Sequence, residues 1–167
     1  MQLPPLTDLL SGLAAAMRPT VGADTLLVGV HTGGVWVAEY LHAELGVATP
    51  LASIDVSFHR DDHHLHAGLR AGGRASRLPD NVAGAHIVLV DDVLYTGRTI
   101  RAALNEIFDY GRPARVDLAV LVDRGGRELP IHADFCPCVL TEPPPAGQSL
   151  NLQRDAAGVL SFEISSA

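Results

Sequence analysis

Short apolar runs alternate along this chain with segments whose apolar residues recur at helical spacing. Strands are predicted at residues 25–30, 51–58, 85–90 and 116–122. Helices are predicted at residues 3–17, 37–45 and 100–108, where apolar side chains return every three or four positions. Apolar runs of this length are typical of parallel strands buried on both faces. The alternation therefore predicts an α/β fold, with a mostly parallel sheet flanked by helices on both faces.

The chain has 167 residues, without internal repeats or a domain-scale linker, so a single domain over residues 1–167 is expected. Its longest polar stretch, residues 59–80, is unusually long for a loop in a compact domain, where such loops are commonly functional. Near the end of the chain, residues 150–153 and 159–164 predict a hairpin that turns around residues 157–158.

All twelve basic residues are arginine, and the net charge of the chain is −7. The absence of lysine excludes a Walker A phosphate loop and a lysine Schiff base. The acidic balance excludes a broadly cationic binder of nucleic acid or membrane. Ten of the twelve arginines nevertheless lie between Arg60 and Arg127, so the middle of the chain suits an anionic ligand.

The sequence shows no feature of a membrane or secreted protein. No apolar run reaches the length of a membrane helix, and the first five residues lack the basic start of a signal peptide. Cys136 and Cys138 lie one residue apart, which is a poor spacing for a disulfide, and no further metal ligands lie nearby. We therefore expect a reduced, cytoplasmic protein that does not bind a membrane.

Two turns follow predicted strands and lead into helices, which is where ligands bind in such sheets: residues 31–34 and 91–99. In the second, Asp91 and Asp92 follow a buried run, and Thr96-Gly97-Arg98-Thr99 opens a helix. Paired carboxylates suit a metal or the vicinal hydroxyls of a ribose. A helix amino terminus with threonine hydroxyls suits a phosphate. Together they indicate a site for a ribose 5-phosphate; the alternative is a solvated acidic turn with Thr96 as an ordinary N-cap.

Residues 87–99 resemble the phosphoribosyl pyrophosphate motif of the type I phosphoribosyltransferases: branched apolar residues, two acids, then Thr-Gly-x-Thr. Residues 29–38, 54–62 and 118–130 look like the PyrR branch of that family, whose members regulate pyrimidine operons and have uracil phosphoribosyltransferase activity. The Asp-Arg-Gly-Gly-Arg-Glu-Leu-Pro stretch at residues 123–130 singles out this branch.

The resemblance extends over about residues 25–135, most of the chain. It implies the type I phosphoribosyltransferase fold, with a mostly parallel sheet flanked by helices. It also implies that the loop 59–80 is mobile and closes over the active site. The C-terminal segment 130–167, which contains the predicted hairpin, would form a small hood.

The resemblance also implies a role for individual residues. Asp91 and Asp92 would bind the ribose 2- and 3-hydroxyls of phosphoribosyl pyrophosphate. The remaining substrate contacts would come from His31, Thr32, Gly33 and Gly34 at the pyrophosphate, from Arg60 of the loop at a phosphate, from Tyr95, Thr96, Gly97, Arg98 and Thr99 at the 5-phosphate, and from Val122, Asp123 and Arg124 near the base. Mg²⁺ would be carried by the substrate, with Asp91 and Asp92 reaching it through water.

The implied reaction converts uracil and phosphoribosyl pyrophosphate into UMP and pyrophosphate. Phosphoribosyltransferases of the hypoxanthine–guanine type resemble this motif but have an aspartate where Tyr95 stands. Because tyrosine is a poor general base at neutral pH, Tyr95 favours a pyrimidine acceptor. Two alternatives stay open: an enzyme for another base, purine or orotate, and a non-catalytic nucleotide sensor that binds RNA.

A second function implied by the branch is UMP-responsive binding of the pyrimidine-operon leader RNA. The residues that would contact RNA are Arg112, Arg115 and Arg127. Gly126 stands where RNA-binding members have histidine. Any such contact rests on few arginines and should weaken with salt. The resemblance further implies a homo-oligomer, a dimer or a tetramer.

Two features depart from the expected pattern or compete with it. The pyrophosphate turn reads His31-Thr32-Gly33-Gly34, where better-known members have Lys-Thr-Arg-Gly, so backbone N–H groups would have to replace two cations. The loop 59–80 contains His59, His63, His64 and His66, which could suggest a metal site. Histidines spaced like this without a fixed scaffold are more commonly solvated.

Overall fold

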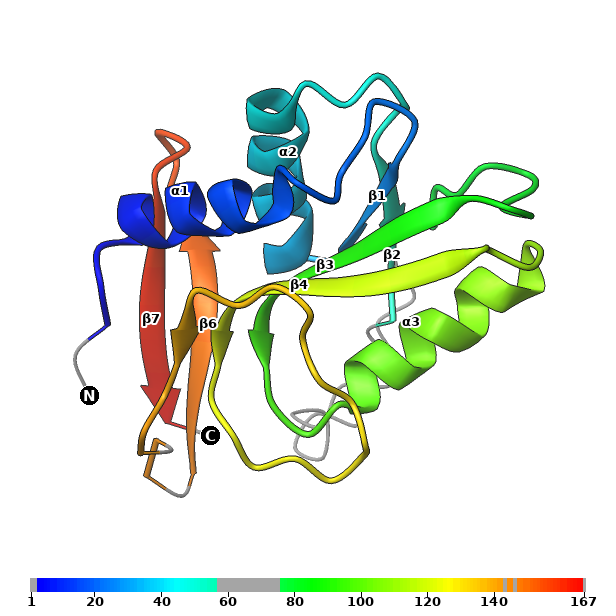
Figure 1. Cartoon of the computed structure of the whole chain (residues 1–167). Helices are drawn as coiled ribbons and strands as arrows, with labels where there is room; N and C mark the ends of the chain where they lie inside the picture. Colours follow the sequence, from blue (N-terminus) through cyan, green and yellow to red (C-terminus); the bar gives the residue numbers. More distant parts are fainter. Residues whose placement is uncertain (1–2, 57–75, 143, 146, 167) are drawn as a thin grey trace.

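Five strands form the central sheet of the protein (Figure 1). The strands are β1 (Leu26–Val30), β2 (Ala52–Ile54), β3 (His86–Leu94), β4 (Arg115–Asp123) and β5 (Cys138–Val139), in the order β2-β1-β3-β4-β5. Every pair of neighbours is parallel, which confirms the predicted sheet. This computed structural model describes residues 3–56, 76–142, 144–145 and 147–166.

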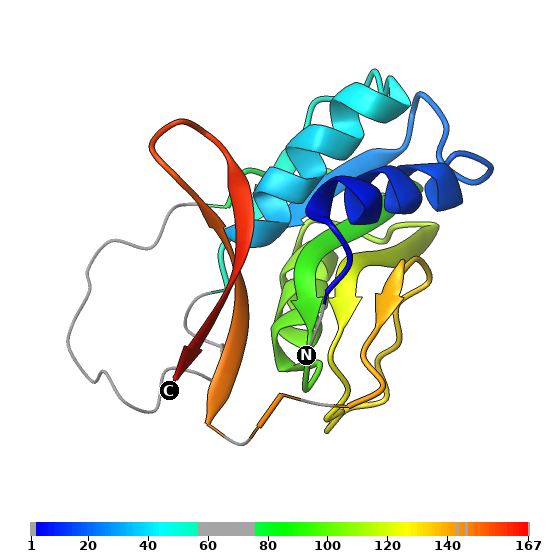
Figure 2. The ribbon, with the colours of Figure 1, turned by 90° about the vertical axis from the view of Figure 1, so that its left-hand side faces the viewer.

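Helices cover both faces of the sheet, as predicted. α1 (Leu6–Met17) and α2 (Gly33–Leu45) lie on one face, and α3 (Arg98–Asp109) lies on the other (Figure 2). Successive residues of the strands alternate between two cores: Val88 and Val90 pack with α1 and α2, whereas Leu89 packs with α3. Because both faces are buried, the strands are apolar throughout, which explains why they stand out in the sequence.

Several boundaries differ from the expected ones. β3 does not end at residue 90 but continues to Leu94, because residues 91–94 keep their parallel pairing with β4. Of the strand expected at 51–58, the structure shows β2, three residues long, within residues 51–56; residues 57–58 lie outside the described part of the chain. α1 begins after the two prolines rather than at residue 3, with Pro5 as its N-cap.

The C-terminal hairpin is confirmed. β6 (Gln148–Arg154) and β7 (Leu160–Ser166) form a separate antiparallel pair, which crosses the edge of the molecule beside α1 and α2 (Figure 2). β6 forms no ladder with the five-stranded sheet. It is attached to the body of the protein by Leu150 and Leu152, which are buried in the core that α1 and α2 cover.

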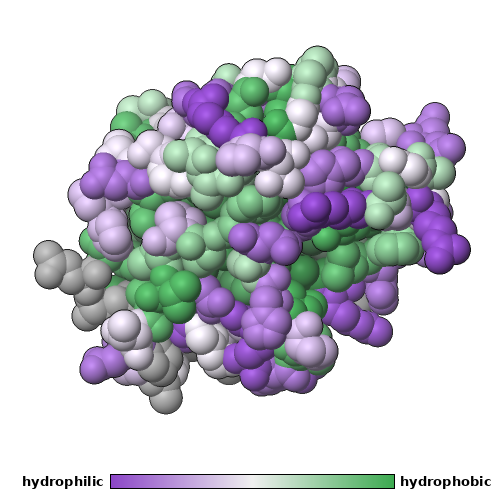
Figure 3. Space-filling view, viewed as in Figure 1, coloured by the Kyte–Doolittle hydropathy of each residue, from purple (hydrophilic) through white to green (hydrophobic). Residues whose placement is uncertain are grey.

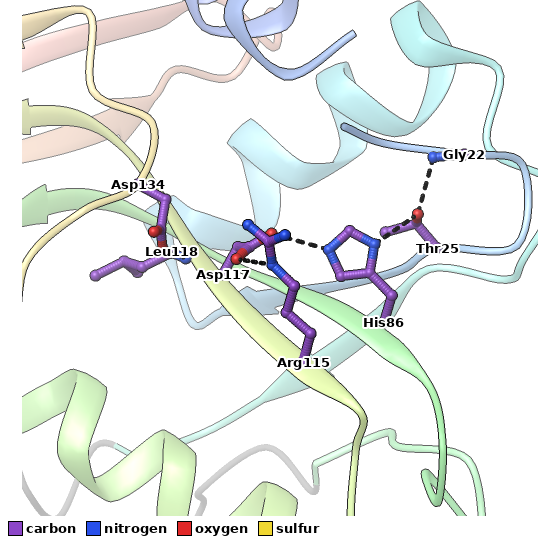
Figure 4. A network of polar contacts seen from close by, with 7 residues as sticks. All are labelled: Gly22, Thr25, His86, Arg115, Asp117, Leu118 and Asp134. Carbon is purple, nitrogen blue, oxygen red and sulfur yellow. Dashed lines mark hydrogen bonds and ion pairs between the residues drawn. The ribbon is translucent and has the colours of Figure 1, made fainter. Parts of the chain in front are cut away.

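A polar network joins the amino-terminal ends of β3 and β4, at the opposite end of these strands from Asp91 (Figure 4). The buried carboxylate of Asp117 accepts from Nε2 of His86 at 2.9 Å and from Nε of Arg115 at 2.6 Å. His86 also contacts the hydroxyl of Thr25 at 3.4 Å, through Nδ1. A buried carboxylate is costly without such partners. The network therefore supports the register of β3 with β4 and engages the Arg115 guanidinium.

Hydrophilic and hydrophobic residues are interspersed over the face shown in Figure 3. Among the helices that the structure describes, none has the length and apolar character needed to cross a membrane.

Cys136 and Cys138 are free thiols. Burial raises the pKa of both thiols, so neither is an activated thiolate.

Candidate functional site

A pocket lies at the carboxyl end of β3, where the sequence predicted the ligand site. Three parts of the chain line it: residues 91–97 with Thr99 and Ile100 of α3, Arg124 after β4, and Ser149, Leu150 and Asn151 of β6. The two acids and the Thr-Gly-x-Thr turn thus face one cavity. Its position agrees with the rule that open α/β sheets bind ligands beyond the carboxyl ends of their strands.

The two acids have different surroundings. Asp91 is 5% exposed, and its Oδ1 accepts from the N–H of Asp92 at 3.0 Å. Asp92 is less buried, and its Oδ2 accepts from the N–H of Leu152 in β6 at 2.9 Å. The hairpin therefore holds one oxygen of the Asp92 carboxylate in a fixed place at the pocket wall.

The turn after β3 positions the amino terminus of α3. Gly97 is the N-cap and has a φ of 94°, a left-handed conformation that glycine adopts without strain. The hydroxyl of Thr96 accepts from the N–H of Arg98 at 3.2 Å. The first turn of α3 therefore opens onto the pocket with the positive end of its helix dipole, a suitable position for a phosphate.

The side chain of Arg98 pairs with a residue of the segment after β4. Its guanidinium pairs with Glu128 at 2.7 Å, and both side chains are about half exposed. The carbonyl oxygen of Thr96 accepts from the backbone N–H groups of Glu128 and Leu129. Arg98 thus ties the turn to the segment after β4.

Beyond the phosphate turn, two side chains stack at the pocket rim. The guanidinium of Arg124 lies 4.0 Å from the centroid of the Tyr95 ring and donates to the carbonyl oxygen of Gln148 at 3.2 Å. Gly126 has a φ of 73°, and a Cβ there would lie 2.4 Å from the Tyr95 ring. The glycine that replaces the expected histidine at 126 therefore leaves room for this tyrosine.

The remaining residues expected near the base are not in the pocket wall. Val122 is fully buried in the core, so its side chain cannot contact a ligand in the pocket. Asp123 pairs with Arg127 at 2.5 Å and accepts from the N–H of Gly125 at 2.9 Å. Arg127 also donates to the carbonyl oxygen of Tyr95. These two residues shape the loop that carries Arg124.

The turn at residues 31–34 lies against the end of β3, although it is not part of the pocket lining. The peptide bond between His31 and Thr32 is cis, and α2 begins at Gly33. A Cβ on Gly33 would lie 2.4 Å from Oδ2 of Asp92, and a Cβ on Gly34 would lie 2.3 Å from the carbonyl oxygen of Val90. The two glycines therefore allow α2 to start directly beside the acids.

Sequence reasoning missed the residues that β6 contributes: Ser149, Leu150 and Asn151 in the lining, and the Leu152 N–H on Asp92. Alternation within the hairpin indicated a buried face, but no local signal indicated where the hairpin docks. Arg60 and the four histidines of the loop lie outside the described residues, so their predicted roles stay predictions.

The three arginines proposed for RNA lie near opposite ends of β4. Arg112 and Arg115 are exposed near the amino-terminal end of β4, and Arg115 pairs with Asp117. Arg127 lies beyond the carboxyl end, paired with Asp123. With a rise of about 3.3 Å per residue, β4 separates its two ends by about 26 Å.

The comparisons with known proteins show the family of the chain. The chain matches the family model of the phosphoribosyl transferase domain over residues 2–147, and it belongs to that family. It is 49% identical over 159 residues to the Bifunctional protein PyrR of Pseudomonas aeruginosa, covering 93% of this chain and 87% of the relative. The Bifunctional protein PyrR of Nitrosococcus oceani is 54% identical over 129 residues, 76% of this chain and 72% of the relative. The predicted resemblance to PyrR is therefore confirmed.

Solved structures show the same fold at lower identity. HGPRT-ase from Leishmania tarentolae, in complex with GMP, gives a TM-score of 0.62 at 19% identity, over 84% of this chain and 81% of that one. Purine phosphoribosyltransferase from Pyrococcus horikoshii gives a TM-score of 0.60 at 22% identity, over 83% of this chain and 84% of that one. They confirm the phosphoribosyltransferase fold and do not bear on the acceptor.

Proposed function

We propose that the protein transfers the phosphoribosyl group of phosphoribosyl pyrophosphate to uracil, producing UMP and pyrophosphate. The observation that carries the proposal is the pocket at the end of β3, which two carboxylates and the amino terminus of α3 line together. Carboxylates suit the ribose diol, and the helix terminus suits the 5-phosphate. The similarity to proteins named PyrR supports the choice of a pyrimidine acceptor.

In this reaction a bond forms between N1 of uracil and C1 of the ribose, while the bond from C1 to the pyrophosphate oxygen breaks and N1 loses its proton. Positive charge develops on the sugar ring. Asp91 and Asp92, bound to the ribose hydroxyls, would place negative charge beside that ring. The turn at residues 96–99 would anchor the 5-phosphate, so that C1 is held in a fixed position relative to the base.

Magnesium is the cofactor that we propose, bound mainly by substrate oxygens. The pocket fits this form of binding, because Asp91 and Asp92 offer the carboxylate oxygens that magnesium prefers. In the part of the chain that the structure describes, no group of three or more His, Cys, Asp and Glu residues could form a protein cage for an ion. Bound magnesium would offset the negative charge of the leaving pyrophosphate.

The acceptor base would lie beside the stacked pair of Tyr95 and Arg124. This position is supported by the guanidinium of Arg124, which lines the pocket, lies over the Tyr95 ring and is held by the carbonyl oxygen of Gln148. The segment 130–167 would act as the hood that we expected, since its β6 supplies one wall of the pocket.

The test is pyrophosphate release from phosphoribosyl pyrophosphate and Mg²⁺ with uracil, orotate or hypoxanthine as the acceptor. We expect release with uracil, and release at least about tenfold slower with either of the other bases, since an acceptor with mismatched polar groups leaves buried groups unpaired. Release with orotate or hypoxanthine but not with uracil would contradict the assignment of the acceptor.

RNA binding in response to UMP is a second function that we propose. It is favoured by the similarity to relatives that carry the name Bifunctional protein PyrR. Arg112 and Arg115 lie near the amino-terminal end of β4 and Arg127 beyond its carboxyl end, so an RNA that contacts all three would extend along β4. Retention of the organism's own pyrimidine-operon leader RNA at low salt, only when UMP is present, would support RNA binding. Equal retention without UMP would contradict it.

The expected dimer or tetramer remains a prediction.

A further inference from the structure

We propose that Arg154 is a positioning residue for Asp92: it clamps β6 onto α2, and β6 in turn holds the Asp92 carboxylate through the Leu152 N–H. The inference rests on the proposed function, because it assigns Asp92 to the ribose hydroxyls. It adds a residue that is distant from Asp92 in sequence and is not part of the pocket lining.

Asp92 lies between two elements that come from opposite ends of the chain. On one side its Oδ2 accepts from the N–H of Leu152 at 2.9 Å. On the other side is Gly33 at the start of α2, where even a single Cβ would lie 2.4 Å from the same oxygen. A shift of β6 relative to α2 would therefore change the position of this oxygen.

Arg154 connects these same two elements. Its guanidinium lies 5.0 Å from the centroid of the Trp36 ring and forms an ion pair with Glu39. Trp36 and Glu39 are three residues apart, so they lie on one face of α2. Arg154 follows Leu152 by two residues, so both side chains project from the same side of β6. The hydrogen bond to Asp92 and the clamp on α2 therefore belong to one short stretch of strand.

β6 needs such a contact because it is not part of the main sheet. Among the strands that the structure describes, its sole partner is β7, and two-stranded hairpins are marginally stable alone. Leu150 and Leu152 anchor it by apolar packing, which is not directional. A guanidinium held between a carboxylate and an aromatic face has a defined position. Arg154 therefore fixes the position of β6 relative to α2, which apolar packing alone leaves adjustable.

The variant Arg154→Gln tests this role, with Arg18→Gln as the matched control. Arg18 also forms an ion pair with α2, at 2.5 Å from Glu44, but at the opposite end of the helix from Gly33. We expect Arg154→Gln to raise the KM for phosphoribosyl pyrophosphate about tenfold, as when a hydrogen bond to a charged group is weakened. We expect a smaller fall in kcat than the rise in KM, because the shifted carboxylate of Asp92 still lies beside the sugar ring when the substrate is bound. Arg154→Lys, which keeps the charge, should restore part of the loss.

Two measurements that do not need turnover separate this inference from the proposed function. The first is the dissociation constant of phosphoribosyl pyrophosphate with Mg²⁺, which should rise in Arg154→Gln by the same factor as KM. The second is hydrogen exchange of the Leu152 amide, which should become at least about fivefold faster, since exchange reports local opening. We expect the Tm of Arg154→Gln and of the control Arg18→Gln to stay within about 2 °C of the Tm of the unchanged protein, as for most surface substitutions.

If the unchanged protein binds phosphoribosyl pyrophosphate but does not react with uracil, the proposed acceptor is wrong, and the dissociation constant still decides the role of Arg154. An unchanged KM and dissociation constant in Arg154→Gln would overturn the inference, even with faster exchange of the Leu152 amide. The same rise in Arg18→Gln would also overturn it, because any ion pair with α2 would then have the same effect.

Discussion

Replacing Asp92 with asparagine should lower the rate of phosphoribosyl transfer at least about tenfold, because a charge-assisted hydrogen bond to the ribose becomes a neutral one. In the structure one carboxylate oxygen of Asp92 accepts from the Leu152 N–H at 2.9 Å, which leaves the other oxygen for a ribose hydroxyl. Asparagine can still accept from Leu152 through its own carbonyl oxygen. Its second group is then an NH₂, which cannot accept from the hydroxyl.

The measurement is the initial rate of pyrophosphate release with uracil, at several concentrations of phosphoribosyl pyrophosphate. Asp109→Asn is the matched control: it removes the same charge at the exposed far end of α3. The control should keep at least about half of the rate, as surface substitutions away from a site usually do. An unchanged rate in Asp92→Asn would show that this acid does not bind the substrate.

Replacing Gly33 with alanine is expected to weaken the binding of phosphoribosyl pyrophosphate by about tenfold or more, through displacement of the same carboxylate. The added Cβ would lie 2.4 Å from Oδ2 of Asp92, closer than such contacts occur. The obstructed atom is the end of a side chain that can rotate, so the fold should survive while the carboxylate moves. Dissociation constants from calorimetry, with Tm values beside them, check both parts.

Gly12→Ala serves as the control for Gly33→Ala. Gly12 lies inside α1, where an added Cβ would make an ordinary contact of 3.6 Å with Pro137. Alanine is the better helix former, so this variant should be more stable by about 0.5–1 kcal/mol without a change in binding. Equal binding by Gly33→Ala and by the unchanged protein would contradict the placement of Gly33 against Asp92.

Much of the fold could be predicted because the strands are buried on both faces. β1, β3 and β4 have no polar face to mask their apolar runs, and α3 keeps its apolar residues on one side. The end of β3 was predicted wrongly because the prediction ended the strand where its apolar run ends. The polar pair Asp91 and Asp92 reads as a turn, yet residues 91–94 continue the ladder with β4.

The candidate site was predicted only where it is local in sequence. The acids and the turn at 96–99 are brought together by one strand–helix connection, so their order along the chain gives their arrangement. The wall from β6 depends on how a distant hairpin docks, which no local pattern specifies. Likewise the pairing of Arg98 with Glu128 joins residues that lie thirty positions apart.

The central claim is that the pocket at the end of β3 holds a ribose 5-phosphate, with Asp92 on the sugar hydroxyls. The most direct test compares the dissociation constants of UMP and of 2′,3′-dideoxyuridine 5′-monophosphate, which lacks both hydroxyls, in the unchanged protein and in Asp92→Asn. The claim predicts that UMP binds at least about tenfold more tightly than the dideoxy compound, and that Asp92→Asn removes most of this difference. Equal binding of the two nucleotides by the unchanged protein would contradict it.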